Sequence, residues 1–186
     1  AHGAPLGAKE IEGTRKQLGW EYGPFEIPQE ALDHYRQAID RGAQWESEWQ
    51  QKWATYKSKY PEDAAELERR IAGKLPEGWD KSLPTYKPED KAAATRAYSG
   101  EVLNAIADAV PEVFGGSADL SGSNKSILKN TGDFQKGEYH HRNLWFGVRE
   151  HGMGAICNGI GRHGGVIPYG ATFLTFSDYM RGAIRL

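Results

Sequence analysis

The segment from Leu144 to Gly154 constrains the fold of this chain more than any other stretch of its sequence. It begins with large apolar residues, Leu144 to Phe146, which predict a short buried strand that ends at the glycine that follows. Charged residues come next, and the glycine-containing run from Glu150 to Gly161 is typical of a helix packed close to a neighbour. Ionisable side chains are costly to bury at such a junction. Because ligands bind at the carboxyl ends of strands in open α/β sheets, this segment predicts a ligand site.

Glu150 has two interpretations that the residues alone leave open. A carboxylate at the start of a helix is stabilised by the unpaired backbone N–H groups, and the adjacent Arg149 offers it a structural ion pair. A carboxyl group held between two buried elements is also suited to exchange a proton with a bound ligand. The first interpretation makes Glu150 a structural residue, and the second makes it catalytic.

Composition argues against several classes of function. The chain has 186 residues, enough for one ordinary domain, and a formal net charge of −2, which does not indicate a surface for nucleic acid or an anionic membrane. No apolar run approaches a membrane-spanning helix, and the first residues lack the pattern of a signal or transit peptide. Cys157 is the only cysteine, so an internal disulfide is excluded. The abrupt start and end are typical of a segment of a longer protein.

The sequence divides into a helical first part and an α/β second part. Residues 1–74 carry helical patterns, and residues 75–90, rich in proline and without periodicity, predict a linker at a domain boundary. Residues 91–186 alternate helices with strands, which favours a parallel sheet with right-handed crossovers. We therefore predict an α/β fold in which a helical segment and a linker precede part of a parallel-sheet domain.

Proline and glycine set the helix boundaries expected in the first part. One helix is predicted from Pro28 to Gly42, where the glycine ends it, and another from Pro61 to Gly73. The helix between them carries an aromatic stripe, which is typical of a packing face, and we predict that it docks onto the parent domain. The stripe consists of Trp45, Trp49, Trp53, Tyr56 and Tyr60.

In the second part, apolar periodicity predicts helices and strands around a long polar loop. The loop, from Asp119 to Arg142, is long for a compact domain and is therefore expected to be functional or disordered. The predicted helices span residues 92–110, 150–163 and 175–186, and the predicted strands span residues 113–118, 144–148 and 165–171.

Four blocks in this order resemble the transketolase family, whose members use thiamine diphosphate. Besides the segment from Leu144 to Gly154, they are His2-Gly-Ala-Pro-Leu6, Phe114-Gly-Gly-Ser-Ala-Asp-Leu120 and Pro168-Tyr-Gly-Ala-Thr-Phe-Leu-Thr-Phe176. The similarity extends over the whole chain, which resembles the plant, algal and bacterial branch of the family most. It implies that residues 1–74 end the diphosphate-binding domain with a helical segment, that 75–90 are a linker, and that 91–186 begin the pyrimidine-binding domain.

The resemblance implies transfer of a two-carbon ketol unit from a ketose phosphate to an aldose phosphate, as in the pentose phosphate pathway and the Calvin cycle. It implies thiamine diphosphate and a divalent metal, Mg²⁺ or Ca²⁺, as cofactors. The family binds the diphosphate and the metal through a Gly-Asp-Gly block that this sequence lacks, so we expect the metal ligands outside residues 1–186 and the segment alone to be inactive. It also implies a homodimer with the active site between subunits, in the cytoplasm or the plastid stroma.

For the cofactor, the resemblance implies roles for residues that follow the predicted strands. Glu150 is implied to be catalytic, with its carboxyl group bonded to N1′ of the aminopyrimidine ring. Phe176 is implied to stack on that ring, with Phe173 lining the pocket and Tyr179 in support, and Asp119 to order the interface near the cofactor. From spacing alone, the aromatic side chains share one face and core packing is the alternative, while a loop cap is the alternative for Asp119.

For the substrate, the resemblance implies three further residues. His2 is implied to be catalytic and to contact both the cofactor and the substrate. Arg96 and Ser123 are implied to bind the phosphate of the sugar, which a planar guanidinium group recognises well. Ser121 is a rival donor to that phosphate, and a solvated side chain is the alternative for Arg96.

Two other functions stay open. The first is a related thiamine-diphosphate enzyme, such as deoxyxylulose-phosphate synthase or a phosphoketolase, against which the helical segment at 28–73 and the match at Arg96 argue. The second is a non-catalytic fragment that acts as an interaction module. The expected partners are sugar phosphates and a second subunit, with no nucleic acid and no membrane.

Overall fold

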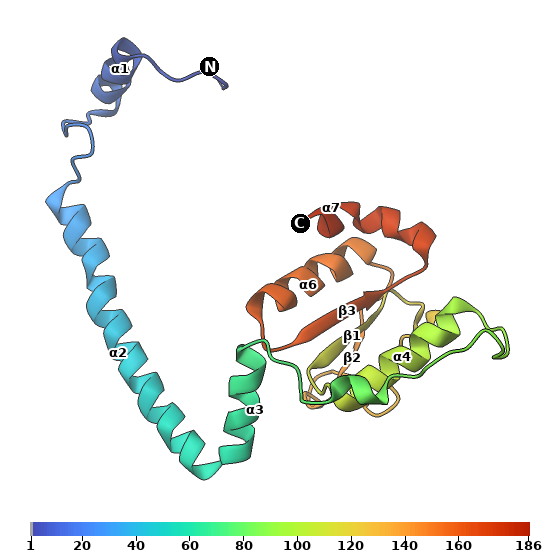
Figure 1. Cartoon of the computed structure of the whole chain (residues 1–186). Coiled ribbons are helices and arrows are strands. Elements are labelled where there is room, and N and C mark those ends of the chain that lie inside the picture. Colours follow the sequence, from blue (N-terminus) through green and yellow to red (C-terminus); the bar gives the residue numbers. More distant parts are fainter. Residues whose placement is uncertain (1) are drawn as a thin grey trace. The chain divides into compact units, whose positions relative to one another are not determined.

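A parallel three-stranded sheet is the framework of the chain from Tyr60 onward, in a computed structural model that describes residues 2–186 (Figure 1). The strands lie in the order β2-β1-β3, and the central one is β1, Val113–Ser117. It pairs in parallel with β2, Asn143–Trp145, and with β3, Ile167–Ala171. The predicted parallel α/β architecture is therefore confirmed.

Helices cover both faces of this sheet (Figure 1). On one face α4, Thr95–Ala109, packs over an apolar cluster, and on the other α6, Glu150–His163, packs over a second. A 3₁₀ helix, η2 (Leu174–Met180), and the short α7 (Arg181–Arg185) pack against α6. The buried residues are Ala107, Val110, Val113 and Leu128 in the first cluster and Ala118, Phe146 and Met153 in the second.

Two glycines of β1 allow the neighbouring strands to approach closely. A Cβ atom on Gly115 would overlap the carbonyl oxygen of Tyr169, and a Cβ atom on Gly116 would overlap that of Leu144. Both obstacles are backbone atoms of the sheet itself, which cannot move aside without disturbing the ladder. The central strand therefore requires glycine here, and the close pairing holds the carboxyl ends of the strands together.

The long loop between β1 and β2 is ordered, so the alternative of disorder is wrong. It begins with a short helix, α5 (Ser121–Asn124), and Leu128 within it is fully buried. The buried side chain of Asn143 fixes the loop: its Oδ1 accepts from the N–H of Leu128 at 2.9 Å, and its Nδ2 donates to the carbonyl oxygen of Leu128 at 3.0 Å. One amide side chain thus satisfies backbone groups that a buried loop would otherwise leave unpaired.

Several predicted element boundaries are wrong. The strand predicted at 144–148 is β2, Asn143–Trp145, and it ends early because Gly147, at a φ of 65°, turns the chain toward α6. The prediction of a buried apolar run also fails at Trp145, which is 57% exposed. The α-helix predicted at 175–186 starts as the 3₁₀ helix η2 and becomes α-helical only at Arg181.

An ion pair joins α3, Pro61–Ile71, to the start of the sheet. Arg69 Nη1 lies 2.7 Å from Oε1 of Glu112, the residue before β1, and Arg69 Nη2 lies 2.7 Å from Oε1 of Glu66. The hydrogen bond from Arg69 lowers the pKa of Glu66 to about 2. Burial acts to raise the pKa of Glu112, but the hydrogen bond from Arg69 and the attraction of its charge outweigh it, so that pKa is lowered as well. Between α3 and α4 the chain forms a short 3₁₀ helix, η1 (Trp79–Ser82).

The unit that ends at Lys59 contains α1, Ala8–Leu18, and α2, Gln29–Lys59. α2 continues through Gly42, so the helix end predicted there is wrong. A glycine inside a helix costs about 1 kcal/mol relative to alanine, which favourable neighbours can offset. One such neighbour is the pair of Gln44 and Glu48, one turn apart, with Nε2 donating to Oε1 at 2.9 Å.

Four of the five residues of the predicted aromatic stripe lie on α2, and Tyr60 follows its end. The rings of Trp49 and Trp53 stack with centroids 6.2 Å apart, and those of Trp53 and Tyr56 stack at 5.8 Å. No residue of α2 is buried, and Trp45 and Trp49 are exposed, so docking of the stripe onto a parent domain stays a prediction.

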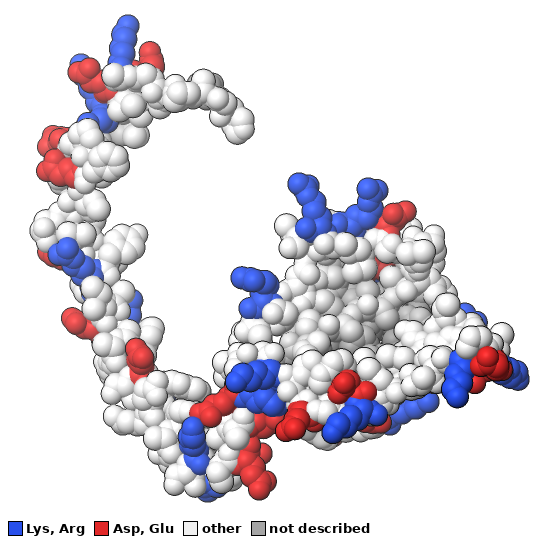
Figure 2. All heavy atoms as spheres, in the orientation of Figure 1, with Lys and Arg blue, Asp and Glu red and all other residues white. Residues whose placement is uncertain are grey.

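The surface carries both signs of charge, and Figure 2 shows basic and acidic side chains interspersed over the helices. This mixture is consistent with the formal net charge of −2. Among the helices of residues 2–186, none has both the length and the apolar character that crossing a membrane requires.

The ion pair between Arg69 and Glu112 predicts an acid-sensitive contribution to stability. Glu112→Gln keeps the shape of the side chain and removes its charge, so the free energy of unfolding should fall by about 1.5–3 kcal/mol at neutral pH. Because the folded state lowers the pKa of Glu112, this contribution is present above the ordinary value of 4.5 and is lost as the pH falls through the lowered value. Chemical denaturation at a series of pH values should therefore show wild type and variant converging in acid.

Glu62→Gln is the matched control for this experiment, because Glu62 also belongs to α3 but is exposed in its first turn. Its effect on the free energy of unfolding should be small, about 0.3–1 kcal/mol at most. A stability difference for Glu112→Gln that stays constant from neutral to acidic pH would contradict the assigned ion pair.

Candidate functional site

A cavity of about 490 Å³ opens at the carboxyl end of the sheet. Its walls come from segments that follow the three strands: residues 118–120 after β1, 148–150 after β2 and 176–179 after β3. This is the edge at which open parallel sheets bind ligands. The lining residues are Ala118, Asp119, Leu120, Val148, Glu150, Phe176 and Tyr179.

Glu150 is the first residue of α6, and only 8% of its surface is exposed. Within residues 2–186 its side chain accepts no hydrogen bond and forms no ion pair. Arg149, which could have paired with it, instead donates from Nη1 to the carbonyl oxygen of Phe146 at 3.0 Å. The alternative of a structural Arg149–Glu150 pair is therefore wrong, and Glu150 lines the cavity.

Asp119 has an unusual backbone conformation at the mouth of the cavity. Its φ is 62°, in the left-handed region that residues other than glycine rarely occupy. Such a conformation costs about 1 kcal/mol or more and is characteristic of sites where the surrounding structure fixes it for a purpose. The side chain is exposed beside the cavity, where a ligand would meet it.

The aromatic residues after β3 form a row of rings. The centroids of Phe173 and Phe176 lie 6.4 Å apart with an interplanar angle of 29°, and those of Phe176 and Tyr179 lie 6.3 Å apart at 30°. The predicted common face is therefore confirmed. Phe176 and Tyr179 line the cavity, but Phe173 does not.

The residues predicted for the sugar phosphate lie apart from this cavity. Arg96 is exposed in the first turn of α4, and Ser123 is exposed in α5. Between these helices lies a separate cavity of about 450 Å³, lined by their neighbours Ala97 and Gly122 and by the buried Ser121. His2 is exposed and belongs to the unit that ends at Lys59, which is described separately from the sheet.

Three apolar residues of the cavity, Ala118, Leu120 and Val148, were not predicted as site residues from the sequence. Val148 is 76% exposed although it is aliphatic, and it stands between the turn glycine and Glu150. Leu120, directly after Asp119, also lines the cavity. The available signal was their position beside the charged residues, since periodicity alone assigns such apolar side chains to the core.

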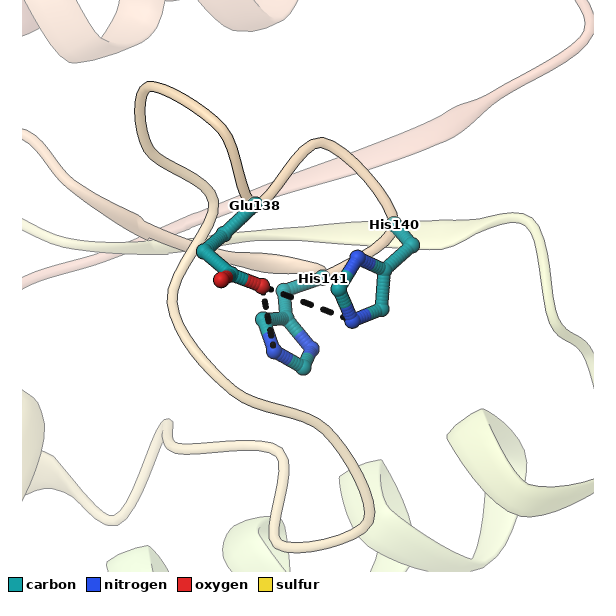
Figure 3. Close-up of side chains that lie close together, drawn as sticks. All are labelled: Glu138, His140 and His141. Carbon is teal, nitrogen blue, oxygen red and sulfur yellow. Dashed lines mark ion pairs between the residues drawn. The ribbon is translucent and has the colours of Figure 1, made fainter.

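A larger cavity, about 820 Å³, lies at the amino-terminal end of the sheet, where its wall includes Glu112 and Val166. Its rim carries His140 and His141, which with Glu138 form a cluster of possible metal ligands (Figure 3). Glu138 Oε2 lies 3.6 Å from Nε2 of each histidine.

This cluster does not fit the divalent metal of the family. Mg²⁺ and Ca²⁺ prefer oxygen ligands, and two of the three side chains are imidazoles. Nδ1 of His141 also accepts the N–H of Gly132 at 3.0 Å, so in the neutral ring Nε2 carries the proton. A protonated nitrogen has no free lone pair and cannot bind a metal ion.

Two family models match the chain. The model described as the transketolase pyrimidine binding domain matches residues 91–186, and the one described as the transketolase thiamine diphosphate binding domain matches residues 1–76. The matches cover the sheet unit with its cavity and the helices that precede it.

Curated relatives carry the same name. A transketolase of Nostoc is 58% identical over the whole chain, which spans 28% of that protein, and the chloroplastic transketolase-1 of Arabidopsis thaliana is 56% identical, with 25% of its length covered. The chain thus spans about a quarter of the length of these relatives.

Solved structures of transketolases resemble this chain. The enzyme of Pichia stipitis in complex with sedoheptulose 7-phosphate matches with a TM-score of 0.86 and 46% identity, over 98% of this chain and 28% of that one. The transketolase of Leishmania mexicana matches with a TM-score of 0.87 and 36% identity, over 98% and 27% of the two chains. The confirmed fold is therefore that of the corresponding part of these enzymes.

The unpaired carboxyl group of Glu150 predicts a gain in stability when its charge is removed. Glu150→Gln should leave the free energy of unfolding of the ligand-free protein unchanged or raise it by up to about 1 kcal/mol, because a largely buried carboxyl group without a partner is costly to the fold. Thermal denaturation without ligand measures this. Glu62→Gln, at the exposed start of α3, controls for the loss of a charge at a helix start. A marked loss of stability in Glu150→Gln alone would show that the carboxylate has a structural partner.

Proposed function

The chain belongs to the transketolase family, and on that premise we propose that its protein transfers a two-carbon ketol unit from a ketose phosphate to an aldose phosphate. The observation that carries the proposal is the cavity at the carboxyl end of the sheet, where the unpaired carboxyl group of Glu150 faces the same space as Phe176. Thiamine diphosphate is the proposed cofactor, and when bound it supplies a nucleophilic carbon and an electron sink.

The cavity residues fit the aminopyrimidine ring of that cofactor. A flat ring with polar edges needs an apolar face to pack against and an acceptor or proton donor at its rim. Phe176 and Tyr179 provide aromatic surface, and Glu150 provides a carboxyl group with no other partner in residues 2–186. We assign Glu150 to the ring nitrogen N1′, Phe176 to the face of the ring, and Asp119 to the edge of the site. Phe173 supports Phe176 through their ring contact.

Glu150 is proposed to hold a proton at N1′ of the aminopyrimidine ring. It is the first residue of α6, only 8% of its surface is exposed, and its carboxyl group has no partner within residues 2–186. A carboxyl group held in place and free of other partners can exchange a proton with a ring nitrogen. The apolar wall of Phe176 and Leu120 keeps water from competing for that proton.

The sugar phosphates are proposed substrates, with Arg96 and Ser123 as phosphate ligands and His2 as a catalytic residue that contacts both cofactor and substrate. Support comes from the exposure of all three side chains, which leaves them free for a ligand, and from the solved relatives that hold sugar phosphates. The divalent metal, Mg²⁺ or Ca²⁺, is proposed to bind through residues beyond 1–186, since the one cluster of possible ligands in residues 2–186 does not fit it.

The domain assignment and the assembly are proposals as well. Residues 1–74 would end the diphosphate-binding domain, 75–90 would link it, and 91–186 would begin the pyrimidine-binding domain, in support of which the family models match 1–76 and 91–186. Two subunits would share each active site, so that His2 and Glu150 of one chain serve different sites. The chloroplastic relatives support a plastid stroma, with the cytoplasm as the other compartment of the family.

The experiment that tests this function is a transfer assay with the full-length protein, thiamine diphosphate and Mg²⁺. Ketol transfer from a ketose phosphate to an aldose phosphate is the expected result. Binding of thiamine diphosphate without ketol transfer would favour another thiamine-diphosphate reaction. Absence of binding would favour a non-catalytic interaction module.

Phe176→Ala is predicted to weaken cofactor binding by about 1–3 kcal/mol in the full-length protein, the scale of a lost buried aromatic contact. Phe173→Ala is the matched control, because Phe173 contacts Phe176 but does not line the cavity, and its effect should be clearly smaller. Isothermal titration calorimetry with thiamine diphosphate compares the two variants. Equal affinities of wild type and Phe176→Ala for thiamine diphosphate would show that Phe176 does not contact the cofactor and only packs in the protein.

A further inference from the structure

Ser117 stands where the three segments that line the cavity begin. It is the last residue of β1, and 2% of its surface is exposed. Its register partners are Trp145 at the end of β2 and Ala171 at the end of β3. Its carbonyl oxygen accepts the N–H of Phe146 at 3.3 Å, directly before the turn that leads to Glu150.

The hydroxyl group of Ser117 connects the other two segments. Its Oγ donates to the carbonyl oxygen of Ala171 at 2.8 Å, just before the aromatic row. The same Oγ accepts the N–H of Leu120 at 3.2 Å, the residue after Asp119. One buried hydroxyl thus bridges the chain on both sides of the cavity.

The side chain of Asn124 in α5 adds a third contact. Its amide group lies 2.9 Å from Oγ of Ser117. In the orientation that satisfies both ends of the amide, Oδ1 accepts from this hydroxyl, whose single proton is then shared between Oδ1 of Asn124 and the carbonyl oxygen of Ala171. The other end of the amide lies 2.7 Å from the hydroxyl of Ser126, and in that orientation it also donates to the carbonyl oxygen of Leu120 at 3.0 Å. Ser126 itself contacts neither Leu120 nor Ala171 through its hydroxyl, so it belongs to the support of α5 and not to the bridge.

We propose that Ser117 is a positioning residue that holds Asp119 and the aromatic row in register at the cavity. Asp119 occupies a left-handed conformation that isolated backbone disfavours, and the bond from the N–H of Leu120 to Ser117 fixes the chain directly after it. The bond to Ala171 fixes the chain before Phe176. The assignment rests on the proposed function, because its consequence is a preformed thiamine-diphosphate pocket.

Removal of this hydroxyl has a specific consequence. In Ser117→Ala the N–H of Leu120 loses its acceptor, while the backbone bond from Ala118 N–H to the carbonyl oxygen of Ala171 remains at 3.1 Å. The loop around Asp119 is then free to leave the left-handed conformation, so the fraction of protein with a formed pocket falls. Apparent affinity falls by the same fraction.

Hydrogen exchange of the ligand-free full-length protein tests the positioning role without the cofactor. In Ser117→Ala, amides in residues 118–124 and 171–176 should exchange roughly tenfold faster, the factor that corresponds to one lost hydrogen bond. Residues 150–163 of α6 should be unchanged. In the control Ser126→Ala, faster exchange should be confined to α5 and the residues that follow it. Unchanged exchange at both 118–124 and 171–176 in Ser117→Ala would overturn the proposal.

Cofactor titration is the second arm. Ser117→Ala should bind thiamine diphosphate roughly tenfold more weakly, Ser126→Ala should bind like wild type, and Ser117→Thr, which keeps the hydroxyl, should recover most of the affinity. Ser117→Cys, with a weaker donor and acceptor, provides a milder change if the alanine variant does not fold. Equal losses in Ser117→Ala and Ser126→Ala would reduce Ser117 to a general structural residue and so reject the proposal.

The two arms separate this proposal from the proposed function. If wild type does not bind thiamine diphosphate, the proposed cofactor is wrong, yet hydrogen exchange still reports whether Ser117 fixes the two segments. If wild type binds and Ser117→Ala binds equally well despite faster exchange, the cofactor assignment stands. Ser117 then steadies the two segments without preforming the pocket, and the proposal is rejected.

Discussion

The close pairing of β1 with both neighbouring strands is the constraint on which the rest of the structure depends. Gly115 and Gly116 leave no room for a side chain against the adjacent carbonyl groups, so the three strands approach as bare backbone. All three run in parallel, and their carboxyl ends therefore meet at one edge. Residues far apart in sequence, Asp119, Glu150 and Phe176, line one cavity for this reason.

Two buried glutamates show how the same side chain serves different ends of the sheet. Glu112, before β1, is held by Arg69 and joins α3 to the sheet, so its charge contributes to stability. Glu150, after β2, has a similar degree of burial but no partner within residues 2–186, and its neighbour Arg149 is bonded to a carbonyl oxygen instead. A largely buried carboxyl group without a partner is costly to the fold, and its place at the ligand-binding edge supports the proposal that it is functional.

Features that depend on neighbouring residues alone, such as a helix start or a shared helix face, could be predicted from the sequence. The break at Gly147 and the charged residues before α6 placed a helix start at Glu150, and a spacing of three placed Phe173, Phe176 and Tyr179 on one face. Neither pattern could tell that Phe173 stays outside the cavity, because that depends on how η2 packs on α6.

Other features depend on distant partners and were therefore missed. The loop after β1 reads as polar and irregular, and only the amide of Asn143, beyond its end, explains why it is ordered. Gly42 reads as a helix end, but the cost of one glycine is small beside the remainder of a 31-residue helix. The roles of His2, Arg96 and Ser123 came from family resemblance alone and stay predictions. Arg96 and Ser123 line neither the cavity at the carboxyl end of the sheet nor the one beside α5.

The central claim is that the carboxyl group of Glu150 moves a proton, and exchange of the cofactor's C2 proton measures this most directly. In the full-length Glu150→Gln variant with thiamine diphosphate and Mg²⁺, quenched-flow NMR should show that exchange slowed by about 10²–10⁴-fold, the usual contribution of a proton-transfer group. Glu62→Gln should exchange at the wild-type rate. A wild-type exchange rate in Glu150→Gln, with cofactor bound, would contradict the account and remove Glu150 from the mechanism.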